Sequence, residues 1–461
     1  MQKFIFGPLL LTGFNTQLHA QETPQNLPDL VVTATRTETA KNQLSAAATV
    51  YTRQDIERLQ AKTLPELLSG TTGIDIVQSG GYGKDTNIYM RGTNTDHVLV
   101  LIDGIKVGSA TSGTIPFQFI PIDQVERVEI IRGPQSSLYG SEAIGGVIQI
   151  FTRKGVQQDK PIVTLDAGGG SYDTYRASGT VSGKWKNSWY TLGSSQFGSQ
   201  GFNSRQPTPG RFGVNEPDKD GYLNTALNAR AGHRFDNNAE VEAFFLLAEG
   251  KTEYDGNFQN KTEFIEQVVG TTASINIVDN WRSILRLGQS RDDGDNFAPD
   301  GTFSSRFNST RWNASWLNEV ALSDDHQLVI GSDYRLDEVE SSTDYKESSR
   351  YDTGIFTELH SRILDDHFIN ASVRGDKNEA FGDQVTGNLG WRYNWNYGIS
   401  PFASFGNAFK APTFNQLYFP GFGNPSLKAE QSTSFEVGES LFLRKLFWAS
   451  LPNKQQKTHD R

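Results

Sequence analysis

The chain has 461 residues, which is enough for more than one domain, and it carries 53 Asp and Glu against 43 Lys and Arg. The resulting formal charge of −10 argues against a nucleic-acid partner, because such a partner requires a basic surface. Cysteine is absent, which excludes disulfides and Cys-ligated metals, while 45 glycines and 11% aromatic residues are typical of all-β chains with many turns.

Residues 1–20 have the pattern of a secretory signal peptide. Lys3 supplies a positive charge, an apolar run follows from residue 4 to residue 14, and Leu18-His19-Ala20 fits a signal-peptidase site. A buried amino-terminal strand is the alternative. No segment has the roughly 18 consecutive apolar residues of a transmembrane helix. If the chain spans a membrane, it must therefore do so as a closed β-barrel.

Residues 21–40 form a leader that begins polar and proline-containing and then becomes β-branched and apolar. A short segment of this kind can add as an extra strand to the sheet edge of another protein. An ordinary first strand of the next domain is the alternative. The segment consists of Asp29, Leu30, Val31, Val32, Thr33, Ala34 and Thr35.

Residues 41–155 predict a domain of mixed α and β structure. The runs T-R-Q-D at 52–55 and T-L-P-E at 63–66 are helix starts with capping residues, and Gly70 ends the second helix. Asp103-Gly104 predicts a tight hairpin after the apolar strand Val98–Ile102. Two further strands, Val125–Ile131 and Gly146–Thr152, are joined by a glycine-rich turn region, for which a hairpin of an α/β domain is the alternative.

Residues 160–438 show alternating polarity without helical periodicity, in segments separated by Gly, Asn, Asp and Ser. In Arg311–Leu322, the tryptophans share one face and polar residues the other, and Trp391–Phe409 alternates in the same way as one run. An apolar outer face and a polar lumen are typical of a transmembrane barrel, although a soluble sandwich alternates similarly. At roughly 20 residues per strand and loop, the region holds about fourteen strands.

The chain resembles the TonB-dependent outer-membrane receptors, and within them the cobalamin receptors. The resemblance rests on four plug-like motifs: the segment 29–35, Arg91-Gly92, Val98–Val107, and the run from Val125 to Thr152. It also rests on the N-A-F-K-A-P run at 407–412 and the N-P-S-L-K-A-E run at 424–430. The resemblance implies an α+β plug domain followed by an antiparallel transmembrane β-barrel.

Barrels of this kind have 22 strands, so the resemblance implies an incomplete barrel of about 14 of an expected 22 strands. The basic, non-alternating tail at 439–461 lacks the closing strand that family members carry. A truncated or frameshifted product is the expectation, and an unusual periplasmic tail is the alternative.

The resemblance assigns roles to several residues. Segment 29–35 resembles the TonB box, through which TonB, the energy-coupling protein of the inner membrane, pulls on such receptors. Arg91 and Arg132 are expected to pair with barrel glutamates and hold the plug, and solvated arginines are the alternative. The plug loops near Ser79, Tyr82, Ser109 and Thr114 are expected to contact the substrate.

Three aspartates are candidate metal ligands. Asp218 and Asp220 lie in an acidic run before a glycine, as in a calcium loop, and Asp255 precedes another glycine. Cobalamin receptors hold calcium in extracellular loops at this place, so the resemblance implies structural Ca²⁺ at Asp218, Asp220 and Asp255. A solvated acidic loop is the alternative.

The expected function is TonB-dependent uptake of cobalamin across the bacterial outer membrane, with outer-membrane lipid around the barrel. One alternative is a ferric-siderophore receptor, in which Tyr82 and Lys84 would suit an anionic chelate. Another is a truncated product that only binds TonB. The sequence has no G-x-S-x-G, H-E-x-x-H or Cys nucleophile, so an enzyme is not expected.

Overall fold

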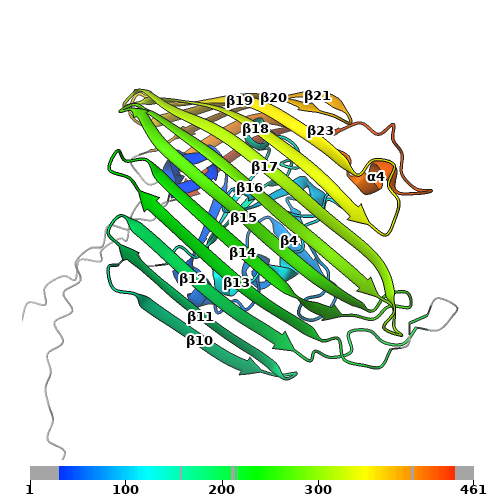
Figure 1. Cartoon of the computed structure of the whole chain (residues 1–461). Coiled ribbons are helices and arrows are strands. Elements are labelled where there is room, and N and C mark those ends of the chain that lie inside the picture. The colour runs from blue at the N-terminus through cyan, green and yellow to red at the C-terminus, as the bar shows by residue number, and fades with distance from the viewer. Residues whose placement is uncertain (1–30, 156–157, 209–212, 215, 396–398, 442–461) are drawn as a thin grey trace, which may run out of the picture.

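The computed structural model describes residues 31–155, 158–208, 213–214, 216–395 and 399–441. A long, curved sheet of tilted strands surrounds a smaller domain built from the first part of the chain (Figure 1). The inner domain is called the plug here, and the outer 14-stranded sheet is called the barrel sheet. None of the helices in the described part of the chain has the length and hydropathy of a transmembrane helix.

The plug is built on a mixed five-stranded sheet in the order β3-β8-β9-β6-β7. Strands β6 and β9 are parallel, and the other neighbouring pairs are antiparallel. Strands β4 and β5 form a separate hairpin. The plug elements are β3 (Ala48–Thr52), α1 (Arg53–Leu59), α2 (Leu64–Ser69), β4 (Ile74–Gln78), β5 (Thr86–Met90), β6 (Val98–Ile102), β7 (Ile105–Lys106), β8 (Val125–Arg132), α3 (Ser136–Tyr139) and β9 (Gly146–Thr152).

The predicted plug elements are confirmed. Thr52 caps α1 in a capping box with Asp55, and Thr63 caps α2 through the backbone N–H of Glu66. Asp103 and Gly104 form the two-residue turn between β6 and β7 with φ of 48° and 83°, and glycine takes such values without strain.

Apolar side chains of the plug sheet form the main core, which extends into the barrel sheet. Val100, Val128 and Ile148 are fully buried in this core, together with side chains of α2. Phe244 and Leu246 of the barrel sheet belong to the same cluster. The plug is therefore packed against the lumen of the barrel sheet and is not a separate globule.

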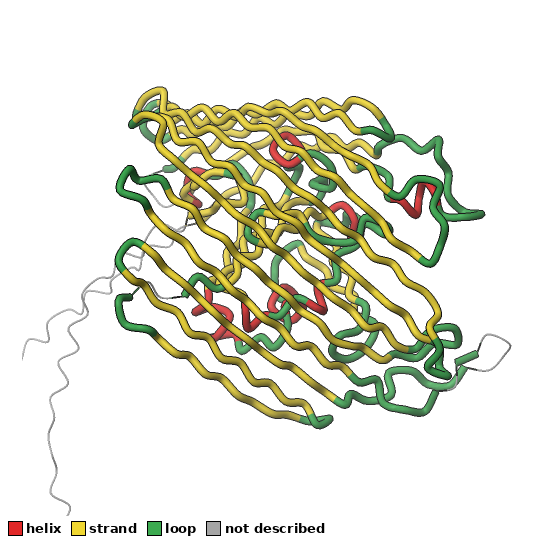
Figure 2. The backbone as a smooth tube through the Cα atoms, viewed as in Figure 1, coloured by secondary structure: helices red, strands yellow, loops and turns green. Residues whose placement is uncertain are grey.

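The barrel sheet is antiparallel throughout, and each strand pairs with its neighbours in sequence. It has the fourteen strands predicted for this region, and helices lie mainly inside its curve (Figure 2). The strands are β10 (Ile162–Gly170), β11 (Thr174–Trp185), β12 (Ser188–Ser199), β13 (Tyr222–Arg234), β14 (Glu240–Glu253), β15 (Lys261–Val278), β16 (Trp281–Phe297), β17 (Phe303–Ser323), β18 (His326–Ser341), β19 (Ser349–Ile363), β20 (His367–Asn378), β21 (Gly382–Tyr393), β22 (Ile399–Lys410) and β23 (Glu430–Leu441).

Alternation along each strand separates an outer apolar face from a polar lumen. In β17, Arg311 is 2% exposed towards the plug, while the next residue, Trp312, is 47% exposed on the outer face. Phe435 and Val437 lie exposed on β23 in the same way. This pattern suits a sheet with lipid outside and the plug inside.

Loop length distinguishes the two ends of the barrel sheet. Two-residue turns at 186–187, 279–280 and 324–325 lie at one end, whereas connections at 200–221 and 411–429 lie at the other. Short periplasmic turns and longer extracellular loops are the rule in outer-membrane barrels.

Two sequence-based expectations are wrong. The alternating run Trp391–Phe409 is not one segment, because it belongs to two neighbouring strands, β21 and β22. Alternation continues across the turn because both strands present their apolar residues to the same outer face. The region after residue 160 also contains a helix, α4 (Phe414–Tyr418), which Thr413 and Gln416 stabilise with a capping box.

Candidate functional site

The segment predicted to bind TonB is folded back in the structure. Strand β1 (Val31–Thr35) pairs with β2 (Thr37–Ala40), and Arg36 at the turn has a φ of 70°. The backbone N–H of Thr33 donates to Glu129 Oε2 in β8 at 2.7 Å. Asp29 and Leu30 lie outside the described residues. The segment is thus one strand of a two-stranded hairpin that is docked on β8 through Glu129.

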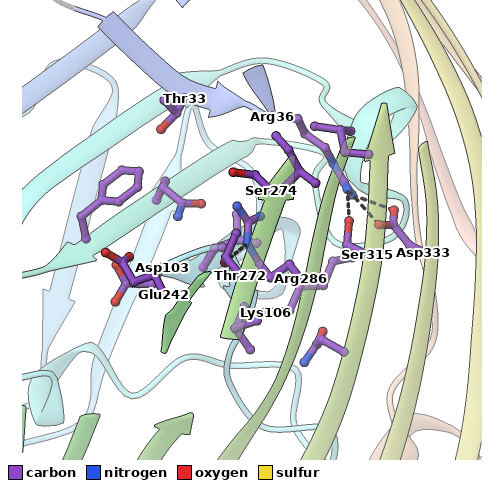
Figure 3. A pocket seen from close by; sticks show the side chains of 18 of the residues that line it. Thr33, Arg36, Asp103, Lys106, Glu242, Thr272, Ser274, Arg286, Ser315 and Asp333 are labelled. Atoms are coloured by element: carbon purple, nitrogen blue, oxygen red, sulfur yellow. Dashed lines mark hydrogen bonds and ion pairs between the residues drawn. The ribbon is translucent and has the colours of Figure 1, made fainter. Parts of the chain in front are cut away.

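Arg36 ties this hairpin to the barrel sheet. Its guanidinium donates to both carboxylate oxygens of Asp333 in β18, at 2.7 and 2.8 Å, and to Ser315 Oγ in β17 at 3.2 Å (Figure 3). It also lies 4.5 Å from the ring centroid of Tyr139 and 4.7 Å from that of Phe356. A bidentate, buried pair of this kind is among the stronger polar contacts in proteins.

Sequence analysis missed Arg36, although it directly follows the segment assigned to TonB. A left-handed backbone conformation is unfavourable for arginine, so the surrounding contacts must offset its cost. No sequence signal identified the partner, because Asp333 lies 297 residues away.

Arg91 and Arg132, the two plug arginines predicted to pair with barrel glutamates, have different kinds of partners. Arg91 donates to both carboxylate oxygens of Glu436 in β23, at 2.6 and 2.9 Å. Arg132 forms no such pair with a barrel glutamate in the described part of the chain. Its side chain turns back into the plug, where it donates to the carbonyl of Thr72 (2.7 Å) and to Thr49 Oγ1 (2.9 Å).

A second contact with β22 and β23 was not predicted. Lys410 of β22 is 1% exposed, and its ammonium lies 2.5 Å from Asp96 of the plug. His97 Nε2 lies 3.0 Å from Glu430 at the start of β23. The plug is therefore held to the last two strands of the barrel sheet at several points.

Arg230 is the hub of a third plug contact. It projects from β13, is 3% exposed, and donates to Asp103 at 2.7 Å and to Thr152 Oγ1 at 2.7 Å. It also pairs with Glu242 of β14. The Asp103-Gly104 turn that the sequence predicted as a hairpin is thus also an ion-pair partner of the barrel sheet.

The first plug loop expected to contact substrate, 79–85, lies against the 200–221 connection. Tyr82 is half-buried and packs edge to face on Phe197, with ring centroids 4.9 Å apart. Ser79 is exposed at the start of the loop, and its N–H donates to the carbonyl of Asp85. Gly83, with a φ of 72°, packs so closely on the Tyr222 ring that a Cβ there would lie 2.0 Å from it.

The second such loop, 107–116, lies against different elements. Ser109 Oγ is 2.7 Å from Thr111 Oγ1, and Thr114 Oγ1 is 2.7 Å from Ser112 Oγ. The N–H of Ala110 donates to Ser309 of β17. Among the described residues, no hydrogen bond or ring contact joins Ser109 and Thr114 to Ser79 and Tyr82, and the two loops pack on different barrel strands, β17 and β12.

Lys84 joins the first plug loop to the connection that carries the acidic run. Lys84 is 2% exposed, and its ammonium donates to the carbonyls of Tyr82, Asp220 and Gly221 and to Thr252 Oγ1, all within 3.3 Å. The amine is therefore engaged by protein oxygens and is not presented to an anionic chelate.

Replacing Lys84 with methionine should remove the part of the pH dependence of the unfolding free energy that Lys84 causes at alkaline pH. Burial lowers the pKa of Lys84 to about 8, although Asp220 and Glu253 oppose the shift. The unfolded chain then binds this proton more tightly, so the free energy of unfolding should rise between about pH 8 and the ordinary value of 10.5. Urea unfolding of wild type and Lys84→Met at several pH values would measure the difference, and parallel profiles would contradict it.

The acidic residues predicted as calcium ligands lie in two neighbouring connections. Asp218 is exposed, whereas Asp220 is buried and accepts a hydrogen bond from the Ser204 N–H at 2.7 Å. Burial raises the pKa of Asp255, and so do the charges of Asp220, Asp218 and Glu216. Asp255 Oδ2 is buried without a hydrogen-bond partner.

Within the described residues, no group of three or more His, Cys, Asp or Glu side chains is arranged as a metal-ligand set. The carboxylates nevertheless repel one another, and Asp255 has an unpaired oxygen. Glu216 links the two connections, because it accepts from the Gly256 N–H and from Asn260 Nδ2. These hard oxygen donors are chemically suited to calcium.

The arrangement defines a class of protein: a plugged membrane barrel whose amino-terminal segment is docked on the plug and on the barrel sheet. A plug-domain family described as "TonB-dependent Receptor Plug Domain" matches residues 40–147. The family "TonB dependent receptor-like, beta-barrel" matches residues 158–451. The chain belongs to the TonB-dependent receptors, a family of outer-membrane receptors and transporters and not of enzymes.

Two curated relatives illustrate the similarity in sequence. The chain is 34% identical over 427 residues to the vitamin B12 transporter BtuB of Photobacterium profundum, covering 91% of this chain and 68% of that protein. It is 36% identical over 435 residues to the protein of the same name from Vibrio cholerae, with the same two coverages.

Solved structures with the same fold are more distant in sequence. A mutant of the ferric enterobactin receptor PfeA of Pseudomonas aeruginosa aligns with a TM-score of 0.76 at 18% identity, covering 90% of this chain and 71% of that one. The siderophore receptor PirA of Acinetobacter baumannii gives a TM-score of 0.70 at 16% identity, covering 86% and 68%. At these identities the likeness concerns the fold alone.

Proposed function

We propose that this receptor takes up cobalamin across the bacterial outer membrane, driven by TonB. The observation that carries the proposal is the docked segment Val31–Thr35, which a few polar contacts hold beside the plug sheet. TonB would capture Asp29–Thr35 by strand addition, because a short β segment pairs through its backbone. Pulling then acts on β8 through Glu129 and on the barrel sheet through Arg36.

The choice of substrate is supported by the two relatives named as vitamin B12 transporters, at 34% and 36% identity over nine-tenths of the chain. Cobalamin would bind at the extracellular end, against the surfaces that carry Ser79, Tyr82, Ser109 and Thr114. Because these surfaces are held by different barrel elements, the ligand would contact both and bridge them.

Calcium would order the extracellular connections in this proposal. Asp218, Asp220 and Asp255 would hold the ion, since their mutual repulsion and the unpaired Asp255 oxygen favour a cation between them. The ion would fix the 200–221 and 254–260 connections together and so shape the mouth of the binding site.

Labelled cobalamin should bind saturably to outer-membrane fractions that contain the chain, and calcium chelation should weaken binding by about tenfold or more. Asp218→Ala and Asp255→Ala should show the same loss even with calcium present. Asp300→Ala is the matched control, because Asp300 lies in another connection, where its carboxylate accepts hydrogen bonds from the N–H and the hydroxyl of Thr302. Saturable cobalamin binding that is unchanged by calcium chelation and by both Asp218→Ala and Asp255→Ala would overturn the calcium role.

A ferric-siderophore receptor is the second candidate, favoured by the folds of PfeA and PirA. Its basis in Tyr82 and Lys84 is weakened, because the Lys84 amine is buried among protein oxygens. Binding of ferric enterobactin without binding of cobalamin would support this candidate. Binding of TonB alone, with neither ligand, would indicate a product that does not transport.

A further inference from the structure

A cavity of about 410 Å³ lies between the β6–β7 hairpin of the plug and the lumen face of the barrel sheet. Arg36, Asp103, Lys106, Arg286 and Asp333 are among the side chains that line it (Figure 3). Its volume falls in the range of sites that hold small molecules or parts of larger ones. It lies on the inner side of the plug, away from the loops expected to bind substrate first.

Several carboxylates that line the cavity already have cationic partners. These pairs are Asp103 with Arg230 at 2.7 Å, Asp333 with Arg36 at 2.7 Å and with Arg374 at 2.6 Å, Glu242 with Lys154 at 3.7 Å, Glu240 with Arg234 at 2.8 Å, and Glu319 with Arg282 at 3.9 Å. Within the described residues, no carboxylate oxygen lies within 4.0 Å of Arg286 or Lys106.

Arg286 points from β16 into the cavity with little local support. Its single hydrogen bond to another described residue is a long one of 3.4 Å, from Nε to Thr272 Oγ1. The guanidinium lies against the hairpin turn, where a Cβ on Gly104 would be 2.5 Å from Nη1. A glycine at the turn thus makes room for a cation that has few protein acceptors.

Lys106 lies two residues after Gly104, in strand β7 of the same hairpin. Its ammonium donates to the carbonyl of Tyr139 at 2.5 Å, which satisfies one of three donors. Burial, together with the charges of Arg335 and Arg374, lowers the pKa of Lys106 to about 8, and the charges of Glu142 and Asp352 oppose this shift.

Arg335 of β18 is a third cationic side chain in this cavity. It lines the same cavity and is 5% exposed, and in the described part of the chain none of its three guanidinium nitrogens has a hydrogen-bond partner. The nearest carboxylate oxygens, on Asp337 and Glu142, lie at 3.4 and 3.7 Å. A buried guanidinium without hydrogen bonds is costly, which favours an additional acceptor in the cavity.

We propose that Arg286 and Lys106 form a binding site for an oxyanion, of the phosphate or phosphate-ester class, inside this cavity, with Arg335 reinforcing the positive field. An oxyanion would accept hydrogen bonds from donors that the protein leaves unused. Building on the proposed function, the site would hold the anionic group of the transported ligand after it leaves the extracellular surface.

Titration of the purified full chain with inorganic phosphate, against chloride at equal ionic strength, tests the site directly. Arg286→Gln and Lys106→Gln should each weaken phosphate binding by about tenfold or more, and Arg286→Lys should restore part of it. Arg282→Gln should have little effect, because Arg282 lines the same cavity but pairs with Glu319. Heat-modifiable migration of each variant checks that its barrel is folded.

The pH dependence of phosphate binding provides an independent measurement. Affinity in the wild type should fall as the pH rises above about 8, where Lys106 loses its charge, and Lys106→Gln should remove this fall. Absence of phosphate binding in the wild type, or equal binding in wild type and Arg286→Gln, would overturn the site.

Uptake measurements then separate the two sources of the anion. Slower cobalamin uptake in Arg286→Gln, with unchanged cobalamin binding at the cell surface, would support a role in transit. Unchanged uptake together with lost phosphate binding would overturn that role and leave a site for free phosphate. Failure of every variant and the wild type to bind cobalamin would refute the proposed function while the phosphate result still stands.

Discussion

Replacing Arg230 with methionine should loosen the plug from the barrel sheet by roughly 3–5 kcal/mol. Arg230 is buried and simultaneously pairs with Asp103 of the plug and Glu242 of the barrel sheet. Methionine keeps an apolar side chain at this position but leaves the buried Asp103 and the partly buried Glu242 without their shared cation. Breaking a buried network from one side costs more than the same pair is worth at the surface.

The loss of plug–barrel stability can be measured by raising the urea concentration and using protease cleavage within the plug as the readout of its release. The matched control is Arg234→Met, since Arg234 of the same strand pairs with Glu240 of β14 at 2.8 Å in a more exposed setting. The control should shift the midpoint only slightly, as expected for a contact worth at most about 1 kcal/mol. Equal midpoints for the two variants would contradict the hub role of Arg230.

Replacing Asp333 with asparagine should free the β1–β2 hairpin from the barrel sheet. Asp333 accepts from Arg36 and Arg374, so its neutralisation leaves two cations without their common carboxylate. Because Arg36 is the hairpin's ion-pair anchor to β18, amide hydrogen exchange at Thr33, Thr35 and Thr37 should accelerate by about a hundredfold or more.

Hydrogen exchange followed by mass spectrometry on peptides that span residues 31–40 would measure this release. Asp325→Asn is a suitable control, because Asp325 pairs with Arg362 in an exposed turn of the same sheet. Exchange in this control should match the wild type. Unchanged exchange in Asp333→Asn would mean that the backbone bonds of β1 alone hold the hairpin.

The plug was predictable from sequence because its signals are local. Capping residues at Thr52 and Thr63 and the Asp103-Gly104 turn each act within a few residues, and the structure places all three as predicted. The number of barrel strands was also predictable from the sequence, because alternating segments and the loops between them recur at regular intervals.

The contacts that hold the plug were not predictable in the same way. Arg36 with Asp333, and Arg230 with Asp103, join residues far apart in the chain. The lumen face of each strand offers several charged side chains, and strand tilt and register decide which of them meets the plug. For Arg132 the motif predicted a glutamate of the barrel as partner. In the structure its guanidinium instead donates hydrogen bonds to Thr72 and Thr49 of the plug.

The order of strands in the barrel sheet limits how many further strands could close it into a ring. Strand β10 and strand β23 are the two edges of an antiparallel series of fourteen, so they run in opposite directions. An antiparallel ring can close across these edges only through an even number of additional strands, zero included. An odd number would force one parallel pair at the seam, and leaving the edges bare in lipid would cost several kcal/mol for each unpaired backbone group. Strands that close the ring across β10 and β23 must therefore be even in number.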